Sequence, residues 1–428
     1  MQCILHVNYV IIEYVLRGCL TVTEFTRSAL HYHEHPLPGK LSIEITKPAS
    51  TPTDLALAYS PGVAEPVRAI ARCPEDVYRY TGKGNQVAVI TNGSAILGLG
   101  NLGPLASKPV MEGKALLFKR FANINAIDIE VDAKNPDEFV ETVARIADTF
   151  GGINLEDIKA PECFEIEQRL IQQCNIPVFH DDQHGTAIVT AAGLFNALEI
   201  QNKATGTIKI VCLGAGAAAC ACMNLLCALG LGRDQITMVD RQGVIYEQRA
   251  GLTGHKIALA TASPARTLDQ ALKDADVLIG LSGANLVSAA QIKLMAPNPV
   301  IFACSNPDPE IAPALVKSIR PDAIMATGRS DFPNQVNNVL AFPFIFRGAL
   351  DTRASCINEP MKLAAVKAIR DLAKSPLPAE LLELYGLKQL SFGPDYIIPM
   401  PLDPRLLTQV APAVARAAQL SGVSRLQT

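Results

Sequence analysis

Short apolar runs that end in polar residues or glycine alternate along the chain with longer stretches of helical periodicity. The strand-like runs are "QVAVIT", "AIDIEV", "PVFHDD", "IKIVCLG", "QITMVD", "DVLIGLSG", "PVIFACSN" and "DAIMATGR". Helical patterns such as "NPDEFVETVARIADTF" and "GTAIVTAAGLFNALEI" lie between many of them. This alternation predicts an α/β fold with largely parallel sheets, and such sheets bind ligands at the carboxyl ends of their strands.

The five runs between Ile208 and Met325 form one continuous series of strands and helices. We therefore expect two domains, which suits a chain of 428 residues. The first is an N-terminal α/β domain over residues 26–185. The second is a Rossmann-type domain with a doubly wound parallel sheet over residues 186–428, and it includes a last amphipathic helix, "APAVARAAQLSG".

The N-terminal residues 1–25 are apolar enough to be compared with a targeting segment. They lack a basic start, and Asn8, Glu13 and Arg17 interrupt the apolar run. A membrane-spanning helix needs roughly 20 nearly uncharged residues, and a signal peptide needs an unbroken apolar centre. We expect a packed helix or an N-terminal extension, and a soluble protein that does not enter the membrane.

Composition narrows the class of protein. The chain is 49% hydrophobic and 18% charged, which predicts a well-folded protein, and its net charge of −3 argues against a nucleic-acid partner. Its eleven cysteines are scattered and form no C-x-x-C pair. They indicate reduced, buried residues in a cytoplasmic protein.

The stretch "AILGLGNLGPLASKP" carries a literal G-x-G-x-x-G at Gly98, Gly100 and Gly103. A phosphate-binding loop needs a helix directly after its glycines, because the N–H groups of the helix N-terminus bind the phosphates. Pro104 follows the third glycine and Pro109 comes soon after it. We expect no helix of ordinary length there, so these glycines are interpreted as a tight turn beside a site.

The looser pattern G-x-G-x-x-A, at Gly214, Gly216 and Ala219, passes the same test. An unbroken helical run, "ACACMNLLCAL", follows it, and the next strand-like run ends at Asp240. An acidic residue at that distance contacts the adenosine ribose in Rossmann-type domains. We expect the dinucleotide to bind here.

The residues around Asp240 leave the choice of cofactor open. A carboxylate repels the 2′-phosphate of NADP and therefore favours NAD. Arg241 and Arg249 lie near enough in sequence to neutralise that phosphate.

Two pairs of adjacent carboxylates suggest a metal site. Glu156 and Asp157 follow one strand-like run, and Asp181 and Asp182 follow another. Adjacent carboxylates repel one another unless a cation or proton lies between them, and hard oxygen donors suit Mg²⁺ or Mn²⁺. One pair alone is more typical of a helix start, since Asp182 could cap the helix after it. Two pairs beside a nucleotide domain favour the metal.

Three further kinds of side chain are candidates for chemistry. Lys114 follows Gly113 among apolar residues, and a partly desolvated lysine has a lowered pKa and can act as a base. Taken alone, Lys114 is more typical of an exposed lysine and Tyr59 of a core tyrosine. His180 and His184 flank the second acidic pair and are interpreted as supporting polar residues.

Together these segments resemble malic enzymes, most of all the bacterial branch. The matching blocks occur in the family's order over about residues 28 to 425, and they are "YSPGVAEP", "ILGLGNLG", "PVMEGKALLFK", "GGINLEDIKAPE", "FHDDQHGTA", "LGAGAAA", "CSNPDPE" and "RSDFPNQVNNVLAFPFIFRGAL". The resemblance implies oxidative decarboxylation of (S)-malate to pyruvate and CO₂, with reduction of NADP⁺ or NAD⁺ and a divalent metal, Mg²⁺ or Mn²⁺. The bacterial branch favours NADP. We also expect a homo-oligomer.

The resemblance also implies roles for single residues. The metal ligands are Glu156, Asp157 and Asp182. Lys114 is the general base with Asp181 as its neighbour, and Tyr59 is the acid that protonates the enolate. The amides of Asn306 and Asn338 lie near the substrate and the nicotinamide, with Asn306 also counted among the cofactor-binding residues.

The sequence departs from the family at three places. Many members have Glu-Arg before "ILGLG", where this chain has Ser94 and Ala95, so another group must bind the substrate carboxylates. The backbone of the glycine turn is one candidate. The first 25 residues match nothing in the family. The resemblance stops before the phosphotransacetylase-like domain of some bacterial relatives, which predicts a short form or a truncated chain.

Two other functions compete with this interpretation. A simple 2-hydroxy-acid dehydrogenase needs the nucleotide loop but no metal cluster. A catalytically silent nucleotide-binding regulator predicts the loss of Tyr59, Lys114 or an acidic ligand, and none is lost.

Overall fold

The computed structural model describes residues 22–252 and 254–426, so the predictions for the first 21 residues lie outside the described part of the chain. The chain divides after Val67 into two compact units. The first contains the helices α2 (Val22–Glu34) and α3 (Pro52–Ala58) and the start of α4 (Ala64–Arg72). A capping box begins α3, since Thr51 and Asp54 each accept the other's backbone N–H.

The second unit begins its regular structure with a parallel four-stranded sheet in the order β2-β1-β3-β4. Its strands are β1 (Gln86–Thr91), β2 (Asn125–Glu130), β3 (Gly152–Leu155) and β4 (Val178–His180). The helices that follow them are α6 (Pro104–Ala122), α7 (Pro136–Ile146), α8 (Glu162–Gln173) and α9 (Asp181–Ile200). Short turns of helix complete this part: η1 (Pro74–Asp76), α5 (Val77–Tyr80), η2 (Lys83–Asn85) and η3 (Ala147–Thr149).

A six-stranded sheet follows in the order β10-β9-β8-β5-β6-β7, parallel except for β7. Its strands are β5 (Ile210–Leu213), β6 (Ile236–Asp240), β7 (Gly243–Val244), β8 (Val277–Gly280), β9 (Val300–Ala303) and β10 (Ile324–Thr327). The helices between them are α10 (Ala217–Ala228), η4 (Arg233–Gln235), α11 (His255–Leu259), α12 (Leu268–Leu272), α13 (Ala289–Lys293) and α14 (Pro313–Ile319). The strand order reverses between β5 and β8, so the expected doubly wound sheet is confirmed.

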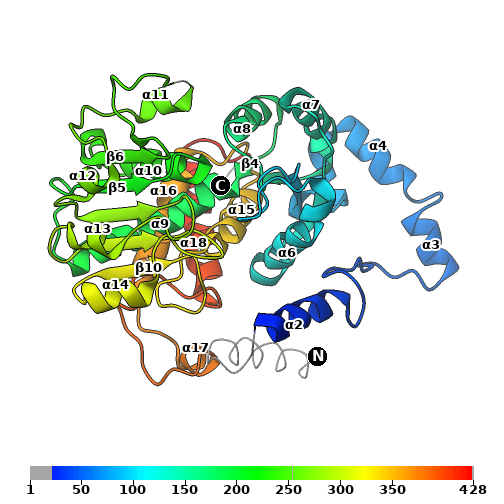
Figure 1. Ribbon diagram of the computed structural model, residues 1–428. Coiled ribbons are helices and arrows are strands. Elements are labelled where there is room, and N and C mark those ends of the chain that lie inside the picture. Colours follow the sequence, from blue (N-terminus) through cyan, green and yellow to red (C-terminus); the bar gives the residue numbers. More distant parts are fainter. Residues whose placement is uncertain (1–21, 253, 427–428) are drawn as a thin grey trace. The chain divides into compact units, whose positions relative to one another are not determined.

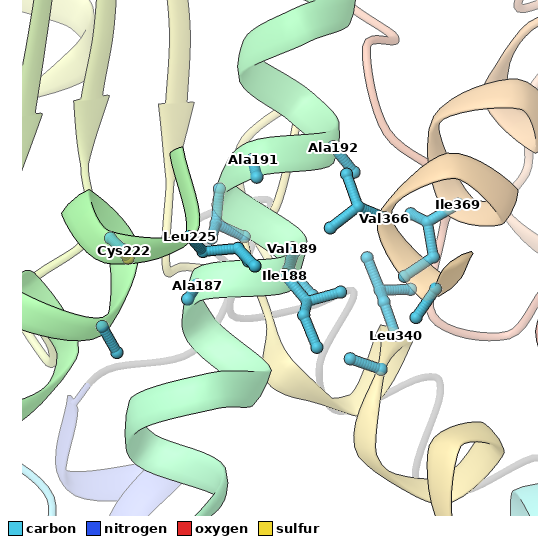
Figure 2. Packing of buried hydrophobic residues seen from close by; sticks show 14 of the residues in the cluster. Ala187, Ile188, Val189, Ala191, Ala192, Cys222, Leu225, Leu340, Val366 and Ile369 are labelled. Carbon is cyan, nitrogen blue, oxygen red and sulfur yellow. The ribbon is translucent and has the colours of Figure 1, made fainter. Parts of the chain in front are cut away.

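The described chain ends in a group of helices (Figure 1). They are η5 (Asn338–Leu340), α15 (Phe342–Asp351), α16 (Glu359–Ala373), α17 (Ala379–Leu384) and α18 (Arg405–Leu420). Of these, η5 and α16 pack against α9, while α15 and α18 pack against α16. Nearly every side of α9 is apolar and buried, because it lies between α10 and α16: Leu225 contacts one side and Val366 the other (Figure 2). No helix in the described ranges is long and apolar enough to span a bilayer.

The helix expected to be missing after the first glycine loop is present. Helix α6 begins at Pro104, runs for 19 residues and contains Pro109. The prediction was wrong because proline is well suited to the first position of a helix, where its fixed φ fits and its missing N–H has no partner to lose. The loop before α6 still differs from the second loop, because its third glycine, Gly103, is the N-cap of the helix, whereas the third small residue of the second loop, Ala219, lies inside α10.

Candidate active site

The two acidic pairs meet at one edge of the four-stranded sheet. Strands β3 and β4 are parallel neighbours with Leu155 paired to His180, so the residues that follow each strand lie side by side. Glu156 and Asp157 leave β3, and Asp181 and Asp182 form the first turn of α9. The helix N-terminus there stabilises negative charge.

Oxygen atoms of Glu156, Asp157 and Asp182 lie within 4.8 Å of one another. Asp182 accepts the backbone N–H of Asp157 at 2.8 Å, and Asp157 accepts that of Leu97 at 3.3 Å. The second carboxylate oxygen of Asp157, Oδ2, is buried without a hydrogen-bond partner. Three hard oxygen donors with one orphaned oxygen fit a divalent cation of the Mg²⁺ or Mn²⁺ type.

Burial and mutual repulsion shift the pKa of every carboxyl in this cluster upward. Burial is the larger cause, and it acts with the neighbouring carboxylates to raise the pKa of Glu156 to about 7 and that of Asp157 to about 8. The same causes raise the pKa of Asp182 to about 6 and that of Asp181 to about 7. The cluster therefore holds protons near neutrality that a cation would displace.

Lys114 reaches this cluster from the middle of α6. Its Nζ lies 2.7 Å from Asp181 Oδ2 and 2.9 Å from Glu156 Oε1, and it stands over the ring of Phe342 at 4.4 Å. The lysine is buried, as a base requires, but the expected fall in its pKa is wrong. Burial does lower the pKa of Lys114, yet the attraction of Asp181, Glu156 and Asp182 outweighs burial and raises it.

The other predicted site residues fall into two groups. Asn338, at the start of η5, lies beside the Asp181 carboxylate, because both side chains pack against Gly185, and so it belongs with the cluster. Asn306 lies in the exposed loop after β9. Tyr59 is the C-cap residue of α3 in the first unit, and its role stays a prediction.

The first glycine turn lies beside the acidic cluster. Ala95 donates its N–H to the Asp157 carbonyl at 2.9 Å, and Leu97 bonds the Asp157 side chain. A Cβ at Gly98 would stand 2.3 Å from the Asn306 carbonyl oxygen, so the turn packs directly on the loop after β9.

The side chain of Ser94 does not face outward, so it does not replace the Glu-Arg side chains that many family members have before "ILGLG". Its hydroxyl donates to Asn92 Oδ1 at 2.6 Å and accepts the Lys159 N–H at 3.0 Å. The first bond is internal to the loop after β1, and the second joins it to the loop after β3.

The second glycine loop has the geometry of a dinucleotide site. Gly214 follows β5 with φ of 131°, a conformation suited to glycine, and a Cβ there would lie 2.4 Å from the carbonyl oxygen of Leu281. Gly216 is the N-cap of α10, and Ala219 is fully buried against the loop. The loop therefore leads directly into the N-terminus of α10 where the strand order reverses, which is the arrangement that binds dinucleotides in such sheets.

Asp240 ends β6 as expected, but its carboxylate is already paired. Arg249 binds both of its oxygens, at 2.8 and 2.7 Å, and Lys256 binds Oδ2 at 2.6 Å. Burial opposes ionisation, but the bonds from Arg249 and Lys256 hold the pKa of Asp240 well below its usual range. The carboxylate of Asp240 balances only one of the two positive charges of Arg249 and Lys256, so the net charge of this group at the end of β6 is positive.

Sequence reasoning missed the partners of these residues. Lys256 carries no motif, so nothing pointed to it. Glu167 did carry a signal, because it shares the apolar face of α8 with Ile166 and Leu170. Its buried carboxylate accepts the N–H of His180 at 3.0 Å and binds His184 Nε2 at 2.9 Å.

An acidic site at the ends of β3 and β4 and a glycine loop at the strand-order reversal of the second sheet define an α/β protein of the dinucleotide-binding class. Comparison with known sequences gives the family. A sequence profile described as "Malic enzyme, N-terminal domain" matches residues 38–171, and one described as "Malic enzyme, NAD binding domain" matches residues 183–387. The chain belongs to the malic enzyme family.

Known relatives match almost the whole chain. An NADP-dependent malic enzyme of Halomonas elongata is 66% identical over 93% of this chain and 94% of its own length. An NADP-dependent malic enzyme of Escherichia coli is 56% identical over 94% of this chain, which spans about half, 53%, of that relative. The crystal structure of malic enzyme from Pyrococcus horikoshii superimposes with a TM-score of 0.86 at 42% identity, covering 94% of this chain and 93% of the other.

Proposed function

We propose that this protein oxidises (S)-malate and removes CO₂ from it, giving pyruvate and CO₂ while NADP⁺ is reduced to NADPH. The observation that carries the proposal is the contact between the three-carboxylate cluster and the Lys114–Asp181 pair. Proton transfer and charge stabilisation can act there on one small substrate. The expected homo-oligomer, cytoplasmic location and domain limits at residues 25/26 and 185/186 stay predictions.

Glu156, Asp157 and Asp182 would hold the divalent cation, because they are the only three acidic groups in the described residues that converge in this way. When bound, Mg²⁺ or Mn²⁺ polarises the carbonyl oxygen formed on oxidation and stabilises the enolate left by loss of CO₂. The cluster's ionised form is the one that binds.

Lys114 is the proposed base for the malate hydroxyl. It donates to Asp181, whose other oxygen, Oδ1, is buried without a hydrogen-bond partner in the described chain, so the pair keeps one acceptor for the proton that Lys114 takes up. Positive charge bound by Glu156 and Asp182 would oppose the protonation of Lys114 and so lower its pKa toward a working value. Asn338 lies beside Asp181 and is proposed near the substrate, Asn306 is proposed near the nicotinamide, and Tyr59 is proposed to return the proton to the enolate.

The Gly214–Ala219 loop is the proposed dinucleotide site, and the cofactor preferred is NADP. Asp240 is neutralised by Arg249 and Lys256, so it cannot repel a 2′-phosphate as an isolated carboxylate would. Lys256 is one-third exposed and can turn toward a ligand. NAD remains a substrate with weaker binding.

The backbone of the glycine turn is the proposed partner of a substrate carboxylate. Ser94 is engaged in the loop and Ala95 has no polar side chain. The N–H groups of Ala95 and Leu97 already donate to Asp157, so the proposed donors are those of Gly98 and Gly100, next along the same turn.

One assay tests the proposal. The purified protein is given malate, Mn²⁺ and either NADP⁺ or NAD⁺, and reduced cofactor and pyruvate are followed together. We expect equal amounts of NADPH and pyruvate, with activity abolished by a chelator and restored by Mn²⁺. Reduced cofactor with oxaloacetate but no pyruvate, or full turnover with a chelator present, would indicate the simple 2-hydroxy-acid dehydrogenase.

A further inference from the structure

Glu310, the last residue of "CSNPDPE", is a buried carboxylate that the proposed reaction does not use. It lies between β9 and α14 and has no exposed surface. It points at Gly280, the last residue of β8, where an added Cβ would stand 2.5 Å from the carboxyl carbon. No ion pair with Glu310 occurs within the described ranges, which excludes a simple salt bridge there.

The carboxylate of Glu310 is shared between two loops. Oε1 accepts the backbone N–H of Ser282 at 2.9 Å, and Oε2 accepts that of Ser305 at 3.1 Å. Ser282 follows β8 and Ser305 follows β9. The main chain reinforces the link, because the N–H of Val287 donates to the Glu310 carbonyl at 3.0 Å. One side chain thus fixes the start of both loops.

These loops border the nucleotide crevice. Gly214 packs against the backbone of Leu281, the residue directly before Ser282. Asn306, directly after Ser305, is the residue against which Gly98 packs. A shift of either loop would therefore move the backbone against which Gly214 of the proposed dinucleotide loop, or Gly98 of the first glycine turn, packs.

Stability alone does not account for such a residue. A buried carboxylate is costly to desolvate, and an apolar side chain of similar volume often stabilises a fold as well or better. Hydrogen bonds to a charged acceptor are strong and directional, so they suit the task of fixing loops.

We propose that Glu310 is a positioning residue for the dinucleotide, holding the loops after β8 and β9 in the conformation that binds it. This inference rests on the proposed function, which supplies the ligand. It concerns cofactor binding and predicts no direct effect on the metal cluster.

The test is the affinity of the full chain for NADPH, measured by nicotinamide fluorescence without malate or metal. In Glu310→Gln an amide N–H₂ replaces one acceptor and faces a backbone donor. We expect the Kd for NADPH to rise about tenfold to a hundredfold, with the activation constant for Mn²⁺ unchanged. Glu310→Asp keeps both acceptors and should restore part of the affinity.

A second variant tests the contact between Glu310 and Gly280 by changing the glycine. Gly280→Ala adds a Cβ that displaces the carboxylate, so it should weaken NADPH binding in the same direction. The matched control is Asp403→Asn, since Asp403 is also buried and holds Arg405 through its N–H and guanidinium. It should lower Tm without changing the Kd.

Two results would overturn the inference. If Glu310→Gln lowered Tm as Asp403→Asn does and left the Kd for NADPH unchanged, Glu310 would be a structural residue only, and the proposed function would stand. If the unaltered protein failed to bind NADPH, the proposed cofactor would fail and the role of Glu310 with it.

Discussion

At the scale of single residues, the environment of Lys114 shows how burial and charge compete. An apolar surrounding alone would weaken the ammonium group, as the sequence suggested. Its closest neighbours are instead two carboxylates on other elements, Asp181 and Glu156, and their attraction dominates. No pattern in the residues around position 114 could have revealed partners 42 and 67 positions away in the chain.

Replacing Lys114 by methionine should remove the proton transfer and keep most of the volume. We expect kcat to fall by about 10² to 10⁴-fold, the usual contribution of a general base, with NADPH binding unchanged in a fluorescence titration. Lys108→Met is the control, because Lys108 lies on the same helix but pairs with Asp128 and Glu130. Equal loss of activity in both variants would contradict the role of Lys114.

Gly98 has an ordinary φ, so backbone conformation does not require glycine at this position. The close contact with the loop after β9 does, because it leaves no room for a side chain. In Gly98→Ala the new Cβ would overlap the Asn306 carbonyl and force the two loops apart. Overpacking of this kind costs about 1–3 kcal/mol, and we expect the KM for malate to rise roughly tenfold. Gly206→Ala, with nothing within 4 Å of its Cβ, is the control, and an unchanged KM in Gly98→Ala would show that the contact is dispensable.

At the scale of elements, α9 connects the acidic cluster with the core. Its first turn carries two of the four acids, and the rest of it is packed between α10 and α16 (Figure 2). Glu167 of α8 holds that first turn by accepting the N–H of His180 and binding His184, which Lys362 of α16 contacts at 3.1 Å. Helix α8 thus fixes the direction in which Asp182 points.

Glu167→Gln should therefore weaken the metal site without touching a ligand. Residues that orient metal ligands typically contribute about 10- to 100-fold in affinity, and we expect a loss in that range for Mn²⁺. Electron paramagnetic resonance of free Mn²⁺ measures it directly, without turnover. Glu165→Gln is the control on the same helix, since Glu165 pairs with Arg169 at the surface; the same loss there would make the effect nonspecific.

The sequence predicts helices and strands correctly where the hydrophobic pattern is long. It fails where the prediction depends on a single residue, Pro104. The expected strand "QVAVIT" coincides with β1, and "GTAIVTAAGLFNALEI" lies within α9. The two-residue strand β7 is too short for any periodicity. Pro104 was taken as a helix breaker, although at the first helical position proline supports a helix.

At the scale of the whole molecule, the acidic cluster ties stability to pH and metal. Folding raises the pKa of Glu156 to about 7, of Asp157 to about 8 and of Asp182 to about 6. Groups shifted upward stabilise the fold fully below their unfolded pKa of about 4. Without metal, this contribution is lost as pH rises from about 4, and the loss is complete once pH has passed the folded pKa values of about 6 to 8.

Divalent metal should reverse that loss, because it binds the ionised carboxylates. We expect Mn²⁺ to raise Tm more at pH 8 than at pH 6, with affinity rising about tenfold per pH unit for each proton displaced. Thermal unfolding with Mn²⁺ and with a chelator measures both effects. Asp182→Asn should abolish most of the difference, and a metal effect independent of pH would contradict the raised pKa values.

The sequence predicted the architecture and the acidic residues because both depend on local order. Strands that alternate with helices must form parallel sheets, and acids at the ends of neighbouring strands must meet, as Glu156 and Asp182 do. The pairing of Asp240 with Lys256, and that of Glu310 with two loops, depends on how distant segments fold together. Those contacts could not be predicted from one sequence.

The close approach of Gly98 to the Asn306 carbonyl also limits how the protein can evolve. Gly98 belongs to the loop beside the acids and Asn306 to the loop beside the cofactor crevice, and no side chain separates them. A larger residue at position 98 is tolerated only if the loop at position 306 moves as well. The two loops are therefore expected to change together among descendants of this sequence, and a graft of either loop into a relative should carry its counterpart with it.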